Sequence, residues 1–320
     1  MWLSLLLFAC AALLTYAIRE FALKKELLDH PNERSSHTIP TPHGGGLAIV
    51  LASYTGFIYL FTQAQMPAEL FWALMASLPL VIISLIDDVR PLSAKLRITV
   101  HFLSAAAALY FLGGVNEADF ILFTLQGVWL NIPALIFIVW MLNLYNFLDG
   151  IDGYAGSEAV FIGLGAFILF GSAPALLIAA ATLGFLLFNW QKASIFMGDV
   201  GSAFLGFIFA VLALHDASSA SFLAWIILPI LFGFDATLTL WRRFRRGDNV
   251  TQAHKEHAYQ RLVQAGFSHQ KTVLLAMFIN LVLLFALFLG GSTAYPYILL
   301  VAIAVLYALV RWIDRLKRAE

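Results

Sequence analysis

The stretch Leu130–Gly153, LNIPALIFIVWMLNLYNFLDGIDG, joins an apolar run to an acidic end that is broken by glycines. No charged residue interrupts its first part, over 130–146. A helix needs about 20 mostly apolar residues to cross roughly 30 Å of hydrocarbon. Ionisable groups at membrane depth are costly and tend to mark function. The stretch therefore indicates a membrane helix with a functional site at its end.

The rest of the chain has the same character. Of its 320 residues, 61% are hydrophobic and only 12% are charged. A soluble domain has about 25% charged residues. We therefore predict an all-α polytopic integral membrane protein, with residues 1–320 forming a single transmembrane domain. The one cysteine, Cys10, excludes an internal disulfide and a cysteine-based metal site. The net charge is zero, and no nucleic-acid partner is expected.

We expect about eleven transmembrane helices. The first is expected to be retained rather than cleaved as a signal peptide, because no basic residue precedes it. Pro79 and Pro229 fall inside expected spans and are predicted to kink them. The expected spans are about 2–20, 44–63, 70–86, 97–114, 130–146, 156–171, 174–190, 200–216, 220–240, 273–290 and 295–312.

The distribution of basic residues predicts the orientation. If the N-terminus is outside, all 19 Lys and Arg residues fall on the cytoplasmic side or at helix ends facing it. This bias predicts a periplasmic N-terminus and a cytoplasmic C-terminus. The segment 115–129 is then expected to be a short external hairpin or a re-entrant piece, since a full span there would turn Arg242–Arg246 outside. The expected cytoplasmic loops are about 21–43, 87–96, 147–155, 191–199 and 241–272.

Five polar motifs fall on that cytoplasmic side, at the ends of different expected helices. The first is Pro40–Gly46, PTPHGGG. Its glycines allow a backbone to approach a ligand closely and leave N–H groups free to bind an anion at a helix start. The alternative is that proline and glycine only punctuate the start of the helix.

The next three motifs supply carboxylates. Asp87 and Asp88 are adjacent, and a cation would relieve their repulsion. A spacing of three places Asn146, Asp149 and Asp152 near one face if that segment stays helical, while glycines favour a ligand-binding loop. Carboxylates gathered at one face suggest a divalent cation and a phosphorylated substrate. The fourth motif is FMGDVGS (196–202), which contains Asp199. The alternative for Asp87 and Asp88 is a solvated helix end, and for Asn146, Asp149 and Asp152 it is an Asx-type turn. The alternative for Asp199 is a helix N-cap.

The fifth motif, His254–Arg261 (HKEHAYQR), places two histidines three residues apart. That spacing also occurs in zinc sites, but a third ligand on the same face is missing. Paired histidines with Lys and Arg suit phosphate oxygens better. The alternative is a solvated amphipathic helix on the membrane surface.

Taken together, the order and spacing of the five motifs over about 30–265 resemble those of the polyprenyl-phosphate N-acetylhexosamine-1-phosphate transferases. This family includes the bacterial phospho-MurNAc-pentapeptide translocase and the undecaprenyl-phosphate GlcNAc-1-phosphate transferase. Its members have ten or eleven helices and a cytoplasmic, Mg²⁺-dependent site. The single domain is then expected to be catalytic. The last motif lacks the three consecutive histidines of the peptidoglycan enzymes and is more similar to the subgroup that starts O-antigen or other surface polysaccharides.

The resemblance implies a role for each motif. Asp199 is expected to be the principal Mg²⁺ ligand with Asp149, and Mn²⁺ could substitute. Asp87 and Asp88 are expected to handle the lipid phosphate, with Asp87 the candidate base. Asp149 and Asp152 complete the catalytic candidates, and Asp152 is the least certain of them. The ring of Phe196 is expected to pack against uracil. The substrate-binding candidates are Thr41, His43, Gly44, Gly45, Lys95, Asn146, Phe196, His254, His257 and Arg261.

The implied enzyme transfers an N-acetylhexosamine 1-phosphate from a UDP-sugar to undecaprenyl phosphate, giving UMP and an undecaprenyl-diphosphate sugar. It is expected in the bacterial inner membrane among membrane lipids, and a homodimer is left open. One alternative is a Mg²⁺-dependent membrane prenyltransferase, although Asp87-Asp88 lacks the further Asp of its Asp-rich motifs. Another is a cation-coupled transporter, which predicts carboxylates near the bilayer midplane and repeated halves.

Overall fold

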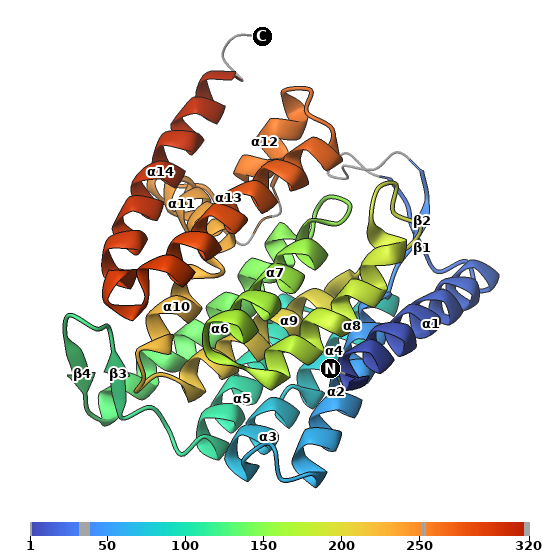
Figure 1. Ribbon diagram of the computed structural model, residues 1–320. Helices are drawn as coiled ribbons and strands as arrows, with labels where there is room; N and C mark the ends of the chain where they lie inside the picture. The colour runs from blue at the N-terminus through green and yellow to red at the C-terminus, as the bar shows by residue number, and fades with distance from the viewer. Residues whose placement is uncertain (1, 32–38, 251, 253, 317–320) are drawn as a thin grey trace.

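The computed structural model of the chain describes residues 2–31, 39–250, 252 and 254–316, so parts of the expected loops 21–43 and 241–272 and of the C-terminal tail lie outside it. The described residues form an all-α bundle with two small two-stranded sheets (Figure 1). Its α-helices are α1 (Trp2–Lys24), α2 (Gly46–Thr62), α3 (Ala68–Met75), α4 (Leu78–Val89), α5 (Ala94–Phe111), α6 (Asn131–Leu148), α7 (Tyr154–Phe170), α8 (Ala173–Asn189), α9 (Gly198–His215), α10 (Ser221–Ile227), α11 (Ile230–Arg246), α12 (Ala258–Gln264), α13 (His269–Gly290) and α14 (Tyr295–Leu316).

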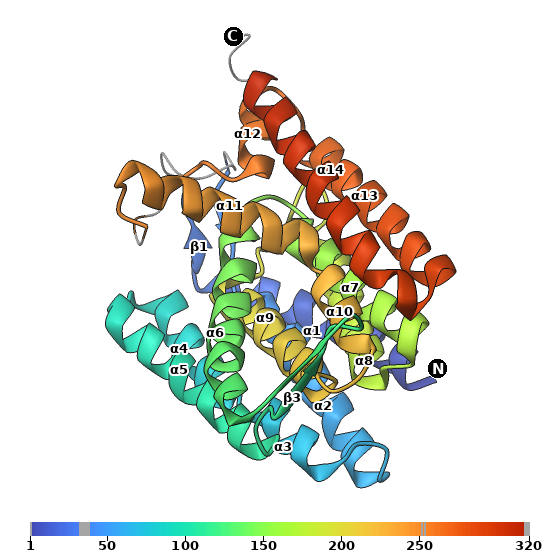
Figure 2. The same ribbon diagram turned by 90° about the vertical axis from the view of Figure 1, so that its left-hand side faces the viewer.

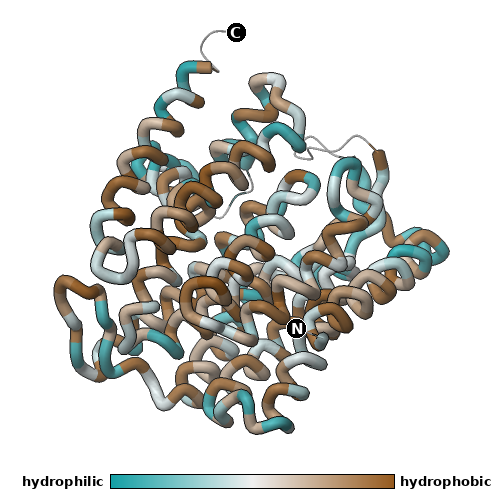
Figure 3. Tube along the Cα trace, in the orientation of Figure 1, coloured by the Kyte–Doolittle hydropathy of each residue, from teal (hydrophilic) through white to brown (hydrophobic). Residues whose placement is uncertain are grey.

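Helix α9 is the centre of the bundle. It is apolar on all sides, as expected of a helix that is surrounded by others, and 83% of its span is buried. It contacts α6, α4 and α2, and its rings of Phe204, Phe207 and Phe209 lie in the core. By contrast, only 22% of α1 and of α13 is buried; α1 lies at the edge of the bundle in Figure 1 and α13 at its edge in Figure 2. Figure 3 shows hydrophobic residues along most helices and hydrophilic ones mainly near their ends.

Membrane-spanning character is confirmed. However, fewer helices than the expected eleven are long and apolar enough to count as membrane spans. Six helical segments of the described chain are long and apolar enough to cross a membrane, or seven if the bent pair α10 and α11 is one span. Helices α2, α7 and α8 are apolar but shorter. A helix occupies each of the eleven expected positions, so the difference concerns length and hydropathy rather than helix placement. The count of eleven spans stays a prediction.

A helix breaks beside each of the two prolines, and the kink predicted at Pro229 is present, whereas the one predicted at Pro79 stays a prediction. Helix α4 begins just before Pro79, after a break that separates it from α3. Helices α10 and α11 meet at Pro229 with a bend of 60°. Proline lacks an N–H and clashes with the preceding turn, so each break falls where the ladder of hydrogen bonds cannot continue.

The segment 115–129 forms a hairpin, as one of the two expectations had it. Strands β3 (Glu117–Asp119) and β4 (Thr124–Gln126) pair antiparallel, and a 3₁₀ turn, η1 (Val128–Leu130), leads into α6. A second 3₁₀ turn, η2 (Ser292–Ala294), joins α13 to α14. The other sheet pairs β1 (Leu28–Asp29) with β2 (Thr41–Pro42). Figures 1 and 2 show α12 at the top of the molecule and β3 well below it.

Candidate active site

Four helices bring polar side chains together beside the first turn of α9. The amide of Asn146, near the end of α6, donates to Asp199 Oδ1 at 2.7 Å. Arg97, in the first turn of α5, lies 3.4 Å from Asp199 Oδ2. The backbone N–H of Asp199 donates to Asp88 Oδ1, near the end of α4, at 3.3 Å. The predicted convergence of the carboxylate motifs on one site is therefore present in the structure.

Asp88 and Asp87 differ sharply although they are adjacent. Oδ2 of Asp88 is buried and has no hydrogen-bond partner among the described residues. Both oxygens of Asp87 are engaged, because Oδ1 accepts from the N–H of Leu92 and Oδ2 from Arg97, each at 2.6 Å. A buried carboxylate oxygen without a partner is costly. Asp88 therefore offers an oxygen to a ligand, whereas Asp87 closes the turn after α4 and holds Arg97.

Arg97 is the main site residue that the sequence did not single out. It pairs with Asp87 at 2.6 Å and remains 38% exposed at its side chain. The predicted substrate-binding candidate in this segment, Lys95, is exposed on the first turn of the same helix. Arg97 could have been found from its spacing, since it shares the start of α5 with Lys95 and follows the two aspartates closely.

Asp149 caps the C-terminal end of α6 and lies beside the same cluster. Burial, followed by the negative charges of Asp199, Asp88 and Asp152, raises the pKa of Asp149 to about 7. Such a shift reflects a carboxyl group that is withdrawn from water and surrounded by other carboxylates. A cation bound nearby would relieve it.

Asp152, by contrast, is tied to structure. Its Oδ2 accepts from the backbone N–H of Ala193 at 3.2 Å and lies 3.5 Å from His269 Nδ1. The neighbouring Gly153 N–H donates to Asn189, whose amide in turn donates to the carbonyl of Ile195. These bonds hold the loop after α6 against the loop before α9, which agrees with a loop-shaping place for Asp152.

The glycine motif lies against the loop that carries Phe196. The N–H groups of Gly45 and Gly46 donate to the carbonyls of Phe196 and Met197 at 2.9 and 2.8 Å. The expectation that these N–H groups are free for an anion was therefore wrong for both glycines. Of the three, only Gly44 has an N–H without a hydrogen-bond partner among the described residues.

The physical requirement for glycine here is the approach of α2 to α9. A Cβ on Gly46 would collide with the backbone of Gly201, and one on Gly201 would collide with Gly46. The pair therefore brings the starts of two helices into direct backbone contact.

Three predicted substrate-binding residues lie beside these glycines. Thr41 is buried in β2 and its hydroxyl donates to the carbonyl of Ile39. His43 lies close enough to Asp199 to act on its charge. Phe196 is half-buried next to them.

The residues of the histidine motif are largely buried or paired with other protein groups in the structure. His257 is only 2% exposed and its ring stacks near Phe147 and His254. His254 is half-buried, and burial, followed by the charges of His257 and Arg243, lowers its pKa to about 4, so it is neutral at pH 7. Arg261 forms an ion pair with Asp314 of α14 and does not reach the carboxylate cluster. The substrate-binding roles of these residues stay predictions.

Two further residues of this region were missed by the sequence reasoning. Asp235 of α11 accepts two hydrogen bonds from the backbone N–H of Ala258, at the start of α12. Tyr259 donates its hydroxyl to the carbonyl of Phe147, at 3.2 Å. Asp235 stands inside an apolar run, where an ionisable residue is itself a signal of function, and the sequence reading passed over that signal.

The residues present fit a divalent cation that is shared with a substrate. No group of three His, Cys, Asp or Glu side chains within the described part of the chain is arranged to enclose a metal ion alone. Mg²⁺, however, is usually held by one or two carboxylates together with substrate phosphates and water. The partnerless Oδ2 of Asp88 and the raised pKa of Asp149 indicate a place for that charge.

Comparison with known proteins agrees with this site. The family model described as glycosyl transferase family 4 matches residues 70–216, which include the aspartates of α4, α6 and α9. The chain is 28% identical to a probable undecaprenyl-phosphate N-acetylglucosaminyl 1-phosphate transferase of Bacillus subtilis (strain 168), covering 92% of this chain and 86% of the relative.

Two further relatives have similar names. A decaprenyl-phosphate N-acetylglucosaminephosphotransferase of Mycolicibacterium smegmatis is 29% identical, covering 83% of this chain and 76% of the relative. An undecaprenyl-phosphate alpha-N-acetylglucosaminyl 1-phosphate transferase of Escherichia coli (strain K12) is 26% identical, covering 84% and 78%.

A membrane-embedded transferase of sugar phosphates is the class that this fold, site and set of relatives define. Over residues 70–216 the chain is similar to glycosyl transferase family 4, and along most of its length it is similar to polyprenyl-phosphate N-acetylglucosaminyl 1-phosphate transferases. The prenyltransferase and transporter alternatives lose their support, because neither accounts for this match.

Proposed function

We propose that the protein transfers N-acetylglucosamine 1-phosphate, or a closely related N-acetylhexosamine 1-phosphate, from a UDP-sugar to undecaprenyl phosphate. The products would be UMP and an undecaprenyl-diphosphate sugar. The observation that carries the proposal is the cluster of Asp88, Asp149 and Asp199 with Asn146 at the ends of α4, α6 and α9. A diphosphate and its counter-ion are the ligand that such an under-neutralised cluster at a membrane surface fits.

The chemistry requires little of the protein beyond positioning. A lipid phosphomonoester has a second pKa near 6 and is largely dianionic at neutral pH. Its oxygen attacks the sugar-bearing β-phosphorus of the UDP-sugar. The bond from that phosphorus to the bridging oxygen then breaks, and UMP leaves with the electron pair. No proton has to be removed from the nucleophile, so a general base is not needed.

The engagement of Asp87 supports this view. Both of its oxygens already accept short hydrogen bonds, which argues against its use as the base. Asp88, with one partnerless oxygen, is the better candidate to act near the lipid phosphate or to hold the cation. We therefore assign Asp87 to the placement of Arg97 and give Asp88 the direct role.

Arg97 is proposed to contact a phosphate. A guanidinium has five N–H donors, and here one nitrogen serves Asp87 and Asp199 while more than a third of the side chain is exposed. Arg matches phosphate oxygens with charge-assisted hydrogen bonds. It would hold a substrate phosphate beside the aspartates.

We propose Mg²⁺ as the cofactor, with Asp199 and Asp149 as its protein ligands, substrate phosphate oxygens completing the site and Mn²⁺ as a substitute. When bound, the cation would neutralise charge on the diphosphate and on the leaving UMP. Asn146 would orient Asp199, because its amide occupies one oxygen and leaves the other facing Arg97.

The proposed setting is the inner membrane of a bacterium, with the N-terminus periplasmic and the site on the cytoplasmic face. The basic residues support this orientation, since all 19 fall on or near one side in the eleven-span arrangement. The lipid phosphate would then reach the site from the interface while its chain remains among lipids. The names of the three relatives support N-acetylglucosamine first, and initiation of an O-antigen or another surface polysaccharide is the proposed use.

The test is release of UMP by purified protein supplied with undecaprenyl phosphate, Mg²⁺ and a panel of UDP-N-acetyl sugars. We expect UMP with at least UDP-N-acetylglucosamine or one of its epimers or deoxy relatives, and only when the lipid phosphate is present. Absence of UMP with every donor, from protein that remains folded, would refute the proposal. Glu69→Gln is the matched control, because Glu69 is an exposed carboxylate at the start of α3, far in sequence from the cluster.

A further inference from the structure

Asp235 is a buried carboxylate that the proposed reaction does not use. It lies on α11 and is only 5% exposed. Its two oxygens accept from the backbone N–H of Ala258 at 2.8 and 2.9 Å, and Oδ1 also accepts from the hydroxyl of Thr239 at 3.1 Å. His257 Nδ1 lies 3.7 Å from Oδ1, which makes an ion pair when the imidazole is protonated. The carboxylate therefore caps the start of α12 from a neighbouring helix.

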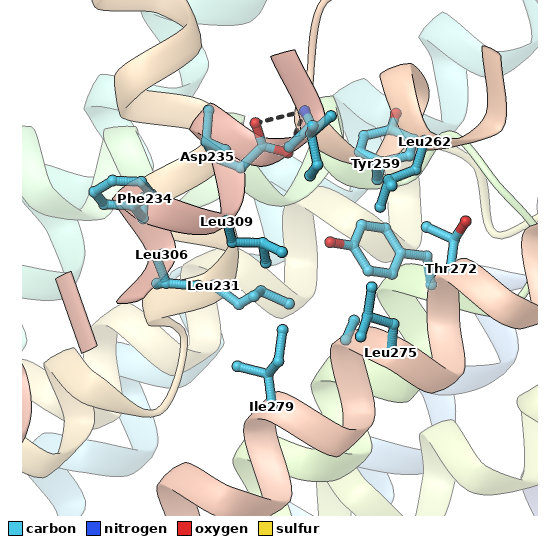
Figure 4. A pocket seen from close by; sticks show the side chains of 15 residues that line it. Leu231, Phe234, Asp235, Tyr259, Leu262, Thr272, Leu275, Ile279, Leu306 and Leu309 are labelled. Atoms are coloured by element: carbon cyan, nitrogen blue, oxygen red, sulfur yellow. Dashed lines mark hydrogen bonds between the residues drawn. The ribbon is translucent and has the colours of Figure 1, made fainter. Parts of the chain in front are cut away.

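The helix that it caps is short, and its buried residues are divided between two cores, with Tyr259 in the main one. Helix α12 has seven residues, and Ala258 and Leu262 pack with Val310 and Ile313 of α14 in a small core that is separate from the main one. A cavity of about 40 Å³ lies beneath it, bounded mostly by apolar side chains of α11, α13 and α14. Figure 4 shows Asp235 at the rim of this cavity, hydrogen-bonded to a backbone nitrogen, with Leu231, Leu306 and Leu309 nearby. Lost contacts around a void weaken apolar packing, so polar bonds have a larger share in holding α12.

A direct path leads from this cap to the carboxylate cluster. Tyr259, the second residue of α12, donates its hydroxyl to the carbonyl of Phe147, beside Asn146 and Asp149. The same hydroxyl fills the space where a Cβ on Gly150 would lie, so the loop after α6 is shaped around it. Whatever fixes the start of α12 therefore also fixes the end of α6.

The far end of α12 and the preceding loop have their own bonds. Arg261 pairs with Asp314, which also pairs with Arg242 at 3.2 Å. The buried Arg243 donates to the carbonyls of Gln252 and Asn249. Asp235 is thus the one described carboxylate that bonds the backbone at the junction between the histidine loop and α12.

We propose that Asp235 is a positioning residue, which locks α12 so that the His254–His257 loop faces the end of α6 and the UDP-sugar. The expected change in KM rests on the proposed function, whereas the locking of α12 by Asp235 does not depend on it. Loss of the carboxylate frees the start of α12, displaces Tyr259 from Phe147 and weakens binding of the sugar-nucleotide while binding of the lipid is retained.

The structural part is tested with a thiol. In a Cys10→Ser background, Ala258→Cys places a single cysteine at a position that is 9% exposed. Ala179→Cys, in α8 and 2% exposed, reports on global opening. We expect Asp235→Ala to raise the rate of labelling of Cys at 258 by a water-soluble maleimide roughly 10-fold or more, the size of a lost buried hydrogen bond. Labelling at 179 should stay unchanged. Asp235→Asn keeps a capping oxygen and should give an intermediate rate.

The kinetic part separates positioning from simple loss of stability. Asp235→Ala should raise KM for the UDP-sugar roughly 10-fold and leave KM for undecaprenyl phosphate within about twofold, with partial rescue in Asp235→Asn. Glu158→Gln is the matched control, since Glu158 is a fully buried carboxylate that bonds Asn280 of α13 and not α12. It should alter neither labelling at 258 nor the KM for the donor.

Two results would overturn the proposal. Unchanged labelling at 258 in Asp235→Ala would show that the carboxylate does not hold α12. Parallel increases at 258 and 179 would make Asp235 a residue of general stability. Labelling is measured without substrate, so a protein that releases no UMP would refute the proposed function and leave the thiol result to decide this inference.

Discussion

The two polar regions at the site end of the molecule differ in how well their charges are matched. Around α9, the carboxylates of Asp88, Asp149 and Asp199 share one arginine and one amide, and an oxygen of Asp88 has no partner in the part of the chain that the structure describes. Around α12, each carboxylate is bonded to a cation or to backbone: Asp235 by Ala258 and Asp314 by Arg261 and Arg242. Unmatched buried charge has to be met by a ligand, whereas matched charge builds structure. The comparison therefore separates the proposed reacting centre from the scaffold that holds the loop predicted to contact the substrate.

The largest expected effect is at Asp199. Asp199→Asn should lower UMP release more than about 100-fold, beyond the 10- to 100-fold typical for partners that only orient a metal ligand. The melting temperature should not fall, because the change removes buried charge. Initial rates at saturating Mg²⁺ and a thermal scan of the same preparation check this. Activity close to wild type would remove Asp199 from the metal site.

Asp87 and Asp88 are adjacent, yet their substitution is expected to affect different properties of the protein. Asp88→Asn should lower activity about 10- to 100-fold with little loss of stability. Asp87→Asn should instead cost about 1 kcal/mol of stability, because it breaks the bond to Arg97 at a partly exposed site. Unfolding curves and rates are measured for both variants in the same detergent. Equal losses of activity and stability in both would contradict the division of roles.

The sequence predicted much of this arrangement, for reasons that can be stated for particular residues. Apolar length located the helices, and Pro79 and Pro229 marked the breaks. The spacing of Asn146, Asp149 and Asp199 was sufficient to expect convergence, since each ends or begins a helix on the same side.

Other features could not be predicted because they depend on three-dimensional partners. Nothing in the local sequence distinguishes Asp87 from Asp88, and only the fold turns one of them toward Arg97. The glycine N–H groups were expected to be free because their partners, the carbonyls of Phe196 and Met197, lie far along the chain. Asp235 was missed for the same reason, since Ala258 becomes its partner only when α12 folds back over α11.

A smaller effect, on the free energy of unfolding, is expected for Asp149→Asn in the absence of metal. Its folded pKa is about 7, above the value of about 4 for a free carboxyl, so its stabilising contribution is full at acid pH and is lost as the pH rises through 7. In EDTA at pH 8, Asp149→Asn should therefore be more stable than wild type by at least about 1 kcal/mol, the energy of one pKa unit. The gain should shrink at pH 5. Urea titrations at both pH values measure it, and a variant less stable than wild type at pH 8 would contradict the account.

The smallest effect is expected in the matched region, at His254. Its folded pKa is about 4, below the usual value of about 6.5, so the unfolded chain takes up a proton first as the pH falls. Its stabilising contribution is therefore present above pH 6.5 and is lost between about 6.5 and 4. His254→Gln should flatten the dependence of stability on pH in that window by no more than about 1 kcal/mol, because the ring is half-buried. Melting temperatures from pH 4.5 to 7.5 test this, and an unchanged slope would show that His254 is not desolvated.

Binding of Mn²⁺ by electron paramagnetic resonance tests the central claim most directly. The unmatched cluster is proposed to hold a divalent cation together with the diphosphate of the donor. Wild-type protein with a UDP-N-acetyl sugar should bind about one Mn²⁺, a cation that Mg²⁺ displaces, and Asp199→Asn should bind markedly less. Asp314→Asn, in the matched region, should bind as wild type does. Equal Mn²⁺ binding by wild type and Asp199→Asn would contradict the assignment of the site.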